Sequence, residues 1–412
     1  MNVDAANAEA LHRIASAQAF LVDVRPAGEV IPGIGEALLH AGPPLTNWAE
    51  ACGALRGAIA GTLLQLGKAS SLTAAEAAAA SGAIELRPAN DVNALATYGG
   101  VINARTPLLV VENRESGVRA FAALNEGRGR ALRYGANDAN TLARLAWLEG
   151  EFAELLGSAV RLCKGVDLFA LLAQALHMGD DGHSRQKAAS ALFLNAIAAF
   201  IVEADFGKEQ TTRGLRFIAQ NEIFFLPMTM AAAKCALASA AHIPGSTVVT
   251  CMCVNGVRFG VKVSGLGDRW CTAPLPTIHG RYFENYGPDD ANPVIGDSEI
   301  AEAFGLGAFA MAAAPALSRY VGGTPEEAKR LSEQMYSITL AEHQRFTIPA
   351  LGFRGAPLAI DARLVVKRGI EPIFNTGIAH REPGVGQIGA GFGHAPRACF
   401  ETALEALSNA AP

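Results

Sequence analysis

The feature that most constrains the fold of this chain is a helical pattern that continues with few breaks from about residue 141 to 241. Apolar residues recur there at three- and four-residue spacing, which is the periodicity of helices with one buried side. Gly245 and Ser246 end the pattern. A block of this length predicts a helical domain, with helices over 142–156, 168–177, 185–202, 209–219 and 228–241.

The sequence before this block mixes strand-like and helix-like periodicity. Residues 20–25 alternate as a strand that Pro26 ends, and Glu76 stands at the capping-box position of a helix that starts at Thr73. Mixed elements over about 135 residues are typical of an α/β unit. The expected elements are helices over 5–18, 50–66 and from 73, and strands over 83–86 and 107–112.

After the block, residues 247–253 and 257–263 predict two strands around Asn255-Gly256, the strongest short hairpin signal in the chain. Helices are expected near 298–314 and 325–338, a strand near 362–368 and a glycine-rich loop over 383–393. A chain of 412 residues is too long for one ordinary core. We therefore expect an α+β fold in several domains: an N-terminal α/β domain over 1–138, a helical domain over 139–243 and an α+β domain over 244–412.

Composition narrows the class of protein. Half of the residues are hydrophobic and 18% are charged, which favours large buried surfaces between domains or subunits and hence a homo-oligomer. The apolar segment 301–317 contains Pro315 and is interpreted as a buried core helix, so no membrane span is expected. The N-terminus lacks the pattern of a secretion signal, which favours the cytoplasm. The net charge of −5, without a basic run, disfavours nucleic acid as a partner.

The seven cysteines are scattered and form no Cys-x-x-Cys pair. Cys251 and Cys253 lie two apart in an expected strand, so both thiols should face one side. This usage is typical of reduced core thiols and disfavours a zinc site. We expect neither a metal nor a cofactor.

The densest polar segment is 177–185, His-Met-Gly-Asp-Asp-Gly-His-Ser-Arg, between two apolar helical runs. Burying so many polar groups is costly unless they bind a ligand or one another. One interpretation is a solvated loop between helices. The other is a catalytic cluster of His177, His183 and Asp180, with Arg185 beside it, because imidazoles exchange protons near neutral pH.

Four residues in the first third are candidate substrate ligands. His40 begins the loop His-Ala-Gly-Pro-Pro, and Arg56 precedes a glycine near a helix start, an arrangement that suits an oxyanion. Asn113 ends an apolar strand and Asn125 lies in the following turn, and open α/β folds place ligand groups at the ends of strands. The alternative is a loop histidine, a surface arginine and ordinary turn chemistry.

The last third adds further candidates. Gly265 and Gly267 follow an expected strand, where successive backbone N–H groups form either an anion-binding nest or a tight turn. Asp297-Ser298 is interpreted as a helix N-cap. Residues 375–391 contain His380, Arg381 and many glycines, which favours a functional loop over a linker. The dinucleotide, Walker and Gly-x-Ser-x-Gly patterns are absent from the sequence.

Taken in order, several of these motifs resemble the YlbE-like bacterial family nearly end to end. Members were long grouped as a domain of unknown function and are associated with a subunit of oxamate carbamoyltransferase in anaerobic allantoin breakdown. The motifs are Val-Asp-Val-Arg-Pro (22–26), His-Ala-Gly-Pro-Pro (40–44), Arg-Gly-Ala-Ile (56–59), Val-Glu-Asn (111–113), Leu-Asn-Glu-Gly (124–127), Gln-Ala-Leu-His-Met-Gly-Asp (174–180), Val-Ser-Gly-Leu-Gly (263–267), Ala-Asn-Pro-Val-Ile-Gly-Asp-Ser (291–298) and Asn-Thr-Gly-Ile-Ala-His (375–380).

The resemblance implies a cytoplasmic α+β protein with a helical insertion that works beside other subunits of a carbamoyltransferase. Its reaction would move a carbamoyl group between phosphate and the amide nitrogen of oxamate, with carbamoyl phosphate, oxamate or a related ureide as small-molecule substrate. Such a site must polarise a carbonyl group and stabilise an oxyanion. From the chemistry of the side chains, we expect His177 and His183 to handle protons or to polarise the carbonyl group. Anion binding is assigned to Arg56, Arg185 and Arg381, and substrate orientation to His40, Asn113, Asn125 and His380.

One segment departs from the family pattern. Relatives are expected to carry a histidine-rich stretch where this chain has 88–100, in which Asn90, Asp91 and Asn93 replace potential imidazoles. A different amide or ureide substrate therefore stays open. Two other functions do as well: a hydrolase of ureides or cyclic amides that uses water in place of phosphate, and a non-catalytic scaffold subunit.

Overall fold

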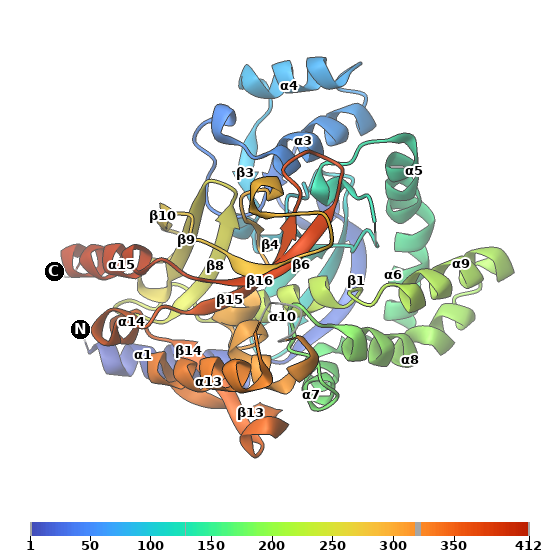
Figure 1. Cartoon of the computed structure of the whole chain (residues 1–412). Coiled ribbons are helices and arrows are strands. Elements are labelled where there is room, and N and C mark those ends of the chain that lie inside the picture. The colour runs from blue at the N-terminus through green and yellow to red at the C-terminus, as the bar shows by residue number, and fades with distance from the viewer. Residues whose placement is uncertain (1, 128, 318–322, 411–412) are drawn as a thin grey trace.

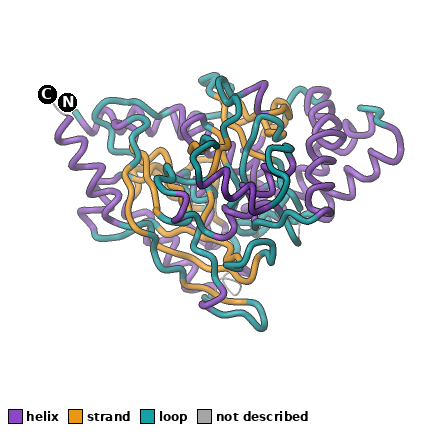
Figure 2. The backbone as a smooth tube through the Cα atoms, turned by 90° about the horizontal axis from the view of Figure 1, so that it is seen from above, coloured by secondary structure: helices purple, strands orange, loops and turns teal. Residues whose placement is uncertain are grey.

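The computed structural model describes residues 2–127, 129–317 and 323–410. The described residues combine many helices with several small sheets, which confirms the expected α+β class. Figure 1 shows strands in the centre, a helical arm on the right and the two chain ends on the left. The same arrangement is visible from above in Figure 2.

One of the sheets in the centre of the molecule has five strands, in the order β4-β6-β5-β1-β7. Its strands pair antiparallel except for β4 and β6, which run parallel. Because side chains alternate along a strand, Leu109 and Val111 of β5 face one core and Leu108 and Val110 face a second core. The strands are β1 (Ala19–Pro26), β4 (Ala94–Leu95), β5 (Pro107–Asn113), β6 (Arg119–Ala123) and β7 (Val166–Asp167).

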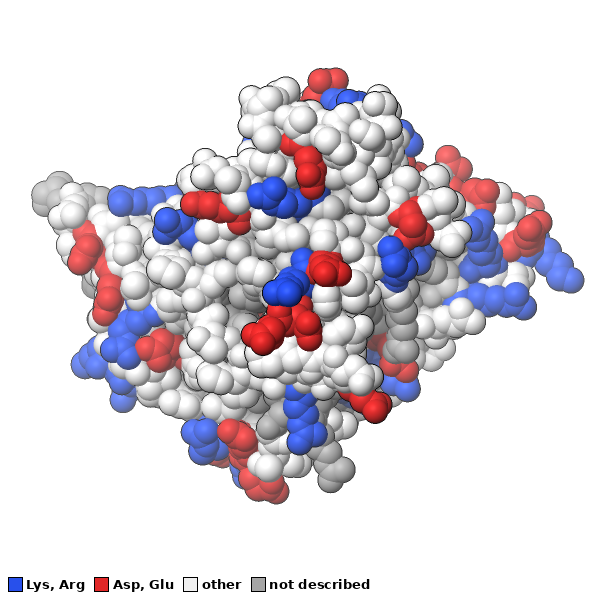
Figure 3. Space-filling view, turned by 45° about the horizontal axis from the view of Figure 1, so that its top comes forward, with Lys and Arg blue, Asp and Glu red and all other residues white. Residues whose placement is uncertain are grey.

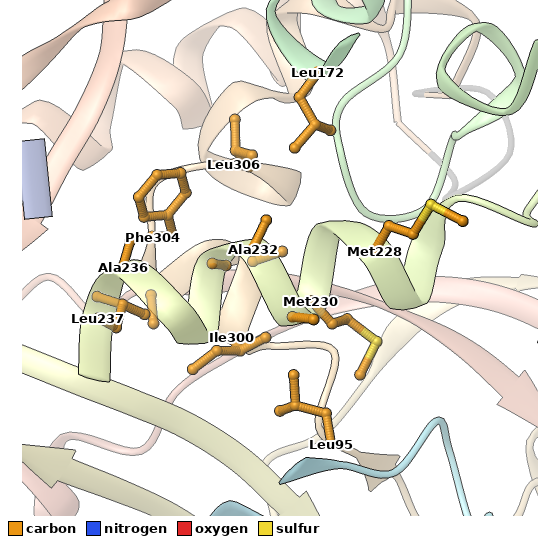
Figure 4. Close-up of a cluster of buried hydrophobic side chains, with 14 of the residues drawn as sticks. Leu95, Leu172, Met228, Met230, Ala232, Ala236, Leu237, Ile300, Phe304 and Leu306 are labelled. Carbon is orange, nitrogen blue, oxygen red and sulfur yellow. The ribbon is translucent and has the colours of Figure 1, made fainter. Parts of the chain in front are cut away.

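Helix α10 (Leu226–Ser239) lies between this sheet and a second sheet, which contains β8 (Val249–Asn255). The helix is buried along almost all of its length. Figure 4 shows it surrounded by side chains from distant parts of the chain, among them Leu95, Leu172 and Phe304. Helix α3 (Gly53–Gln65) packs in the core on the opposite face of the sheet, with α4 (Leu72–Ala80) outside it. Helix α4 starts one residue before the expected position, and its N-cap is Ser71.

Most helices of the block form the arm in Figure 1, whereas its last helix, α10, lies in the centre, and the helices overlap the expected segments. Two residues of the block, Val166 and Asp167, form β7 and pair with β1, which ties the arm to the first sheet. The elements are α5 (Ala139–Trp147), a π-helical turn (Leu148–Phe152), α6 (Ala153–Leu162), α7 (Leu168–His177), α8 (Lys187–Glu203) and α9 (Gly207–Gln220).

The last part of the chain contains the expected hairpin, with Val254 opposite Phe259. Three small sheets have the orders β10-β9-β8-β12, β11-β16-β15 and β13-β14. Their strands are β8 (Val249–Asn255), β9 (Arg258–Val263), β10 (Cys271–Pro274), β11 (His279–Tyr282), β12 (Ile295–Gly296), β13 (Thr339–Ile348), β14 (Arg354–Ile360), β15 (Ile373–Ala379) and β16 (Gln387–His394).

Short elements complete the described chain. Strands β2 (Leu38–His40) and β3 (Leu86–Pro88) pair parallel, and β3 begins where the strand expected over 83–86 would end. The helices are α1 (Val3–Ser16), α2 (Ala27–Val30), α11 (Ile300–Ala303), α13 (Pro325–Met335), α14 (Ala362–Arg368) and α15 (Arg397–Ala410).

Three expectations for the last part of the chain are wrong. Residues 362–368 form a helix because Asp361 caps its first turn and Gly369 ends it in the left-handed conformation. The helix expected over 298–314 is broken at Gly305. The backbone there packs so closely against Pro357 that a Cβ would lie 1.9 Å from the carbonyl oxygen of Pro357. The glycine-rich loop is largely strand β16, whose glycines allow β11 to approach closely.

The largest hydrophobic core cluster draws residues from α1, the first sheet, the helical arm and the C-terminal part. The proposed three-domain division therefore remains a prediction about a chain with a shared core. No helix within the described ranges is long and apolar enough to cross a membrane. Figure 3 shows positive and negative side chains interspersed over the visible face.

Candidate functional site

A short acidic segment occupies the centre of the molecule. Asp297, Glu299 and Glu302 lie between β12 and the end of α11, and all three are 0% exposed. Asp297 does not cap the following helix, so the N-cap expectation is wrong. Its carboxylate accepts hydrogen bonds from the backbone N–H groups of Gly42 and Ala96, at 2.8 and 2.7 Å. The segment is therefore held by loops from the N-terminal third.

His183 forms an ion pair with Glu302 inside the protein. The imidazole Nδ1 lies 2.8 and 3.0 Å from the two carboxylate oxygens, and His183 is 4% exposed. Burial alone lowers the pKa of His183, but attraction and hydrogen bonding to Glu302, with Asp181 and Glu299 nearby, raise it to about 9. His183 is thus an imidazolium at neutral pH, and its Nε2 has no hydrogen-bond partner among residues 2–127, 129–317 and 323–410.

Asp181 and Asn375 join the two dense polar segments of the sequence. The Asn375 side chain donates to Asp181 at 2.8 Å, and its backbone N–H donates to Glu302 at 3.1 Å. The other oxygen of Asp181 accepts from the backbone N–H groups of His183 and Arg185. Segment 177–185 and strand β15 therefore meet at this point, as a convergent site requires.

Glu299 is the member of this group whose carboxyl has no hydrogen-bond partner in the described structure. Burial raises the pKa of Glu299 well above its usual range, His183 opposes the rise, and Glu302 and Asp297 add to it. This rise favours the neutral, protonated form of the carboxyl. We call Asp181, His183, Glu299, Glu302 and Asn375 the core polar cluster.

Of the residues expected to be catalytic, His183 alone belongs to the core polar cluster. Asp180 flanks it: one oxygen accepts from the backbone N–H of Ala189 at 2.8 Å, and burial raises its pKa to about 6. Arg185 donates to the carbonyl oxygen of Gly179 at 2.8 Å and lies 3.6 Å from Asp180. His177 is exposed and bonds Thr347 of the β13–β14 hairpin instead.

The predicted ligands of the first third do not converge. His40 is buried, bonds its neighbour's carbonyl oxygen and leaves Nε2 without a partner in the described structure. Arg56 donates to three carbonyl oxygens of its own loop, over 48–51. Asn113 and Asn125 lie at opposite ends of the β5–β6 ladder, so one small pocket cannot contain both.

The predicted ligands of the last third also lie apart from the cluster. The N–H groups of Gly265 and Gly267 donate to Ser246 and Ser264, so these turn amides already have acceptors. His380 lies 4.0 Å from Asp290 and stacks edge-on with Tyr286. Arg381 is exposed, and its backbone N–H donates to Asp290.

The sequence reasoning missed Glu299, Glu302 and Asn375 as site residues. Three acidic residues within six positions, followed by the apolar segment 303–317, were the available signal. Carboxylates in such surroundings are rarely buried unless they are paired or functional.

Asn90 belongs to segment 88–100, the segment that departs from the family pattern, and it connects that segment to Asp297 and Cys253. Its side chain donates to Asp297 at 2.9 Å and to Cys253 at 3.1 Å. The sulfur atoms of Cys251 and Cys253 lie 3.3 Å apart, which confirms that both thiols face one side. Within the described residues, no group of three or more His, Cys, Asp or Glu side chains is arranged to hold a metal ion.

Known proteins resemble this chain over nearly its whole length. The family model described as oxamate carbamoyltransferase subunit AllG matches residues 84–298. The chain is 43% identical to the protein of that name from Escherichia coli (strain K12), over 99% of this chain and 98% of the relative. The chain belongs to the AllG family. The YlbE-like name expected from the sequence motifs remains a prediction.

Two further proteins are similar over nearly the whole chain. The uncharacterised protein YahG of Escherichia coli (strain K12) is 43% identical over 98% of this chain and 85% of its own length. A crystal structure of a conserved protein of unknown function from Enterococcus faecalis V583 is 41% identical, with a TM-score of 0.96 over 99% of this chain and 98% of that one. The AllG-family chain therefore shares its full architecture with a solved protein.

Proposed function

We propose that the chain is a subunit of an oxamate carbamoyltransferase and works with other subunits. The observation that carries the proposal is the full-length similarity to the relative of that name, at 43% identity. The reaction would transfer a carbamoyl group between phosphate and the amide nitrogen of oxamate. Its substrates in the direction of cleavage are phosphate and the ureide oxalurate.

We further propose that this subunit supplies catalytic groups from the core polar cluster. A phosphate oxygen attacks the carbamoyl carbon of oxalurate, the carbon–nitrogen bond breaks, and the departing amide nitrogen takes a proton. The protonated carboxyl of Glu299 can supply that proton and then recover the one that phosphate loses. The imidazolium of His183 can donate a hydrogen bond to the carbonyl oxygen as charge develops on it.

Burial of the cluster determines how substrate can reach it. His183 is 4% exposed, while Asp181, Glu299 and Glu302 are 0% exposed. Substrate can therefore enter after a neighbouring segment moves, and we propose that assembly with the partner subunits produces this opening. The same burial supports the alternative that the cluster stabilises a non-catalytic subunit, because a closed ion pair can serve structure alone.

The test is phosphate-dependent cleavage of oxalurate by the complete assembly, with Glu299→Gln as the variant. Because burial favours the neutral form of the Glu299 carboxyl, glutamine should preserve folding and assembly while removing the proton donor. We expect the turnover rate to fall by about 100-fold or more. His343→Gln is the matched control, because His343 is also buried but bonds Phe304 outside the cluster, and it should retain turnover.

Each outcome distinguishes the candidate functions. Full activity of a folded Glu299→Gln assembly would assign this chain a structural role in the enzyme. Absence of cleavage by the wild-type assembly would reject the carbamoyltransferase proposal. Cleavage of equal rate in phosphate-free buffer would indicate the hydrolase instead.

A further inference from the structure

A small cavity lies where the parallel strands β4 and β6 both end. Its volume is about 50 Å³, and residues following β4 and β6 line one side of it. Gln65 of α3 and Leu148 and Glu149 of the π-helical turn line another side. The carboxyl ends of parallel strands are a common place for ligands in α/β folds. We call this space the Arg133 cavity.

The volume limits what the cavity can hold. A buried water molecule needs about 10–15 Å³ of such space, so the cavity has room for about three to five non-hydrogen atoms. A carbamoyl or ureido group has this size, whereas an intact oxalurate molecule is larger. The cavity can therefore accept one end of such a substrate.

Two residues that line the cavity each carry a buried polar atom with no hydrogen-bond partner among the described residues. The two atoms are Nη1 of Arg133 and Oγ1 of Thr97. Arg133 is 3% exposed, and its Nη2 donates to the carbonyl oxygen of Gly127 at 2.8 Å. Its guanidinium lies over the ring of Tyr134, so the orientation of the planar group is fixed. An unpaired buried donor is costly, which favours occupation by a ligand that accepts from it.

The charges around the cavity favour a neutral group over an anion. The carboxylate of Glu126 accepts from the backbone N–H groups of Leu132 and Arg133, at 2.6 and 3.0 Å, and compensates the nearby guanidinium. Glu149 is paired with Arg105 at 2.8 Å. Among the described residues that line the cavity, positive charge is not in excess, so a carboxylate or phosphate would gain little attraction there.

Asn125, a predicted substrate ligand, lines the cavity but has its amide group engaged elsewhere. It donates to the carbonyl oxygen of Ile223 and accepts from Gly127 and Asn221. It therefore shapes the wall. Arg133 and Thr97 are therefore the residues that can recognise a ligand. The Nη1 of Arg133 can donate to a carbonyl oxygen, and the Oγ1 of Thr97 can accept from an amino group.

We propose that the Arg133 cavity is a ureide-binding site separate from the core polar cluster, which its lining residues do not include. It holds the planar carbamoyl end of the bound ureide, with the carbonyl oxygen on Arg133 and the amino group on Thr97. Oxalurate as the natural ligand rests on the proposed function, but recognition of a ureido group does not. The cavity also adjoins the acidic segment, because the cavity-lining residue Ala96 donates its backbone N–H to Asp297 at 2.7 Å.

Binding of N-methylurea and oxalurate to the purified full chain tests this proposal. Thr97→Val removes the hydroxyl but keeps the shape of the side chain, and we expect ureide affinity to fall about three- to tenfold, the effect of one neutral hydrogen bond. Thr97→Ser should restore affinity. Thr62→Val is the matched control, because Thr62 has a buried unpaired hydroxyl in α3 but does not line the cavity, and it should bind as wild type does.

Acetate and inorganic phosphate serve as anion probes. We expect neither to compete with N-methylurea. The proposal is overturned if the chain does not bind the ureides, if Thr97→Val binds them as tightly as wild type, or if acetate displaces them. Ureide binding that depends on Thr97, together with an assembly that does not cleave oxalurate, would leave this inference standing and reject the proposed function.

Discussion

At the scale of the residue, the state of His183 depends on a single strong partner. Burial opposes a charged imidazole, yet the two oxygens of Glu302 hold the proton at Nδ1. His343 shows the opposite balance. It is also buried, but its partner is the neutral carbonyl oxygen of Phe304, and burial lowers its pKa to about 4.

This contrast predicts a specific dependence of stability on pH. The pKa of His183 rises from 6.5 to about 9 on folding, so its stabilisation is fully present below pH 6.5 and is lost as pH rises to about 9. The loss amounts to about 3 kcal/mol at most. Urea denaturation between pH 6 and about 9.5 should show this decline for wild type and a flatter profile for His183→Gln.

His343→Gln is the control for that measurement. The lowered pKa of His343 means that its contribution is lost as pH falls from 6.5 towards 4, and not on the alkaline side. The control should therefore keep the alkaline decline and lose part of the acid decline. Parallel alkaline profiles of wild type and His183→Gln would contradict the assigned protonation state.

At the scale of the element, the glycines of β16 are needed for the sheet to form. Strand β11 packs so closely that a Cβ on Gly391 would lie 2.4 Å from the carbonyl oxygen of His279. A Cβ on Gly389 would lie equally close to Arg281. These close approaches explain why a segment that is rich in glycine is a regular strand.

Gly391→Ala should therefore lower the free energy of unfolding by about 1–3 kcal/mol, because the added methyl group forces β11 and β16 apart. Chemical denaturation measures the change. Gly150→Ala is the control, since a Cβ on Gly150 in the π-helical turn would have no packing neighbour within 4 Å, and alanine favours helix there by up to about 1 kcal/mol. Equal stability of Gly391→Ala and wild type would show that β11 can shift freely.

At the scale of the whole molecule, Asn7 connects the N-terminal helix to the last third of the chain. Its side chain donates to Thr247 at 2.8 Å and to Asp361 at 3.2 Å. Its oxygen accepts from the hydroxyl of Ser246 and from the backbone N–H of Thr247. Helix α1 is thereby fixed to the start of the C-terminal part and to the N-cap of α14, consistent with a core that draws on all parts of the chain.

Asn7→Ala should destabilise the protein by about 3 kcal/mol, because it leaves several buried polar groups without partners. Asn195→Ala, on the exposed side of α8, should change stability by less than about 0.5 kcal/mol. Thermal unfolding of the two variants side by side makes the comparison. If Asn7→Ala unfolds like Asn195→Ala, α1 does not stabilise the body of the protein.

Local sequence patterns determined much of the fold and part of the candidate site. The helical block, the Asn255-Gly256 hairpin and the shared orientation of Cys251 and Cys253 follow from periodicity and turn chemistry, which depend on neighbours in sequence. The strand expected over 362–368 failed because two adjacent valines favoured a strand, whereas Asp361 and Gly369 fix a short helix. The position of His183 in a dense polar segment was also visible in the sequence.

Only the tertiary structure decided which charged groups meet. Glu302 is more than a hundred residues from His183 and Asn375 is still farther from Asp181, so no local period can reveal these contacts. The pKa of a carboxyl depends on the atoms packed around it, as burial shows by raising the pKa of Glu299. Sequence sets the short-range geometry of the chain, whereas burial and electrostatics are set by residues brought together from distant positions.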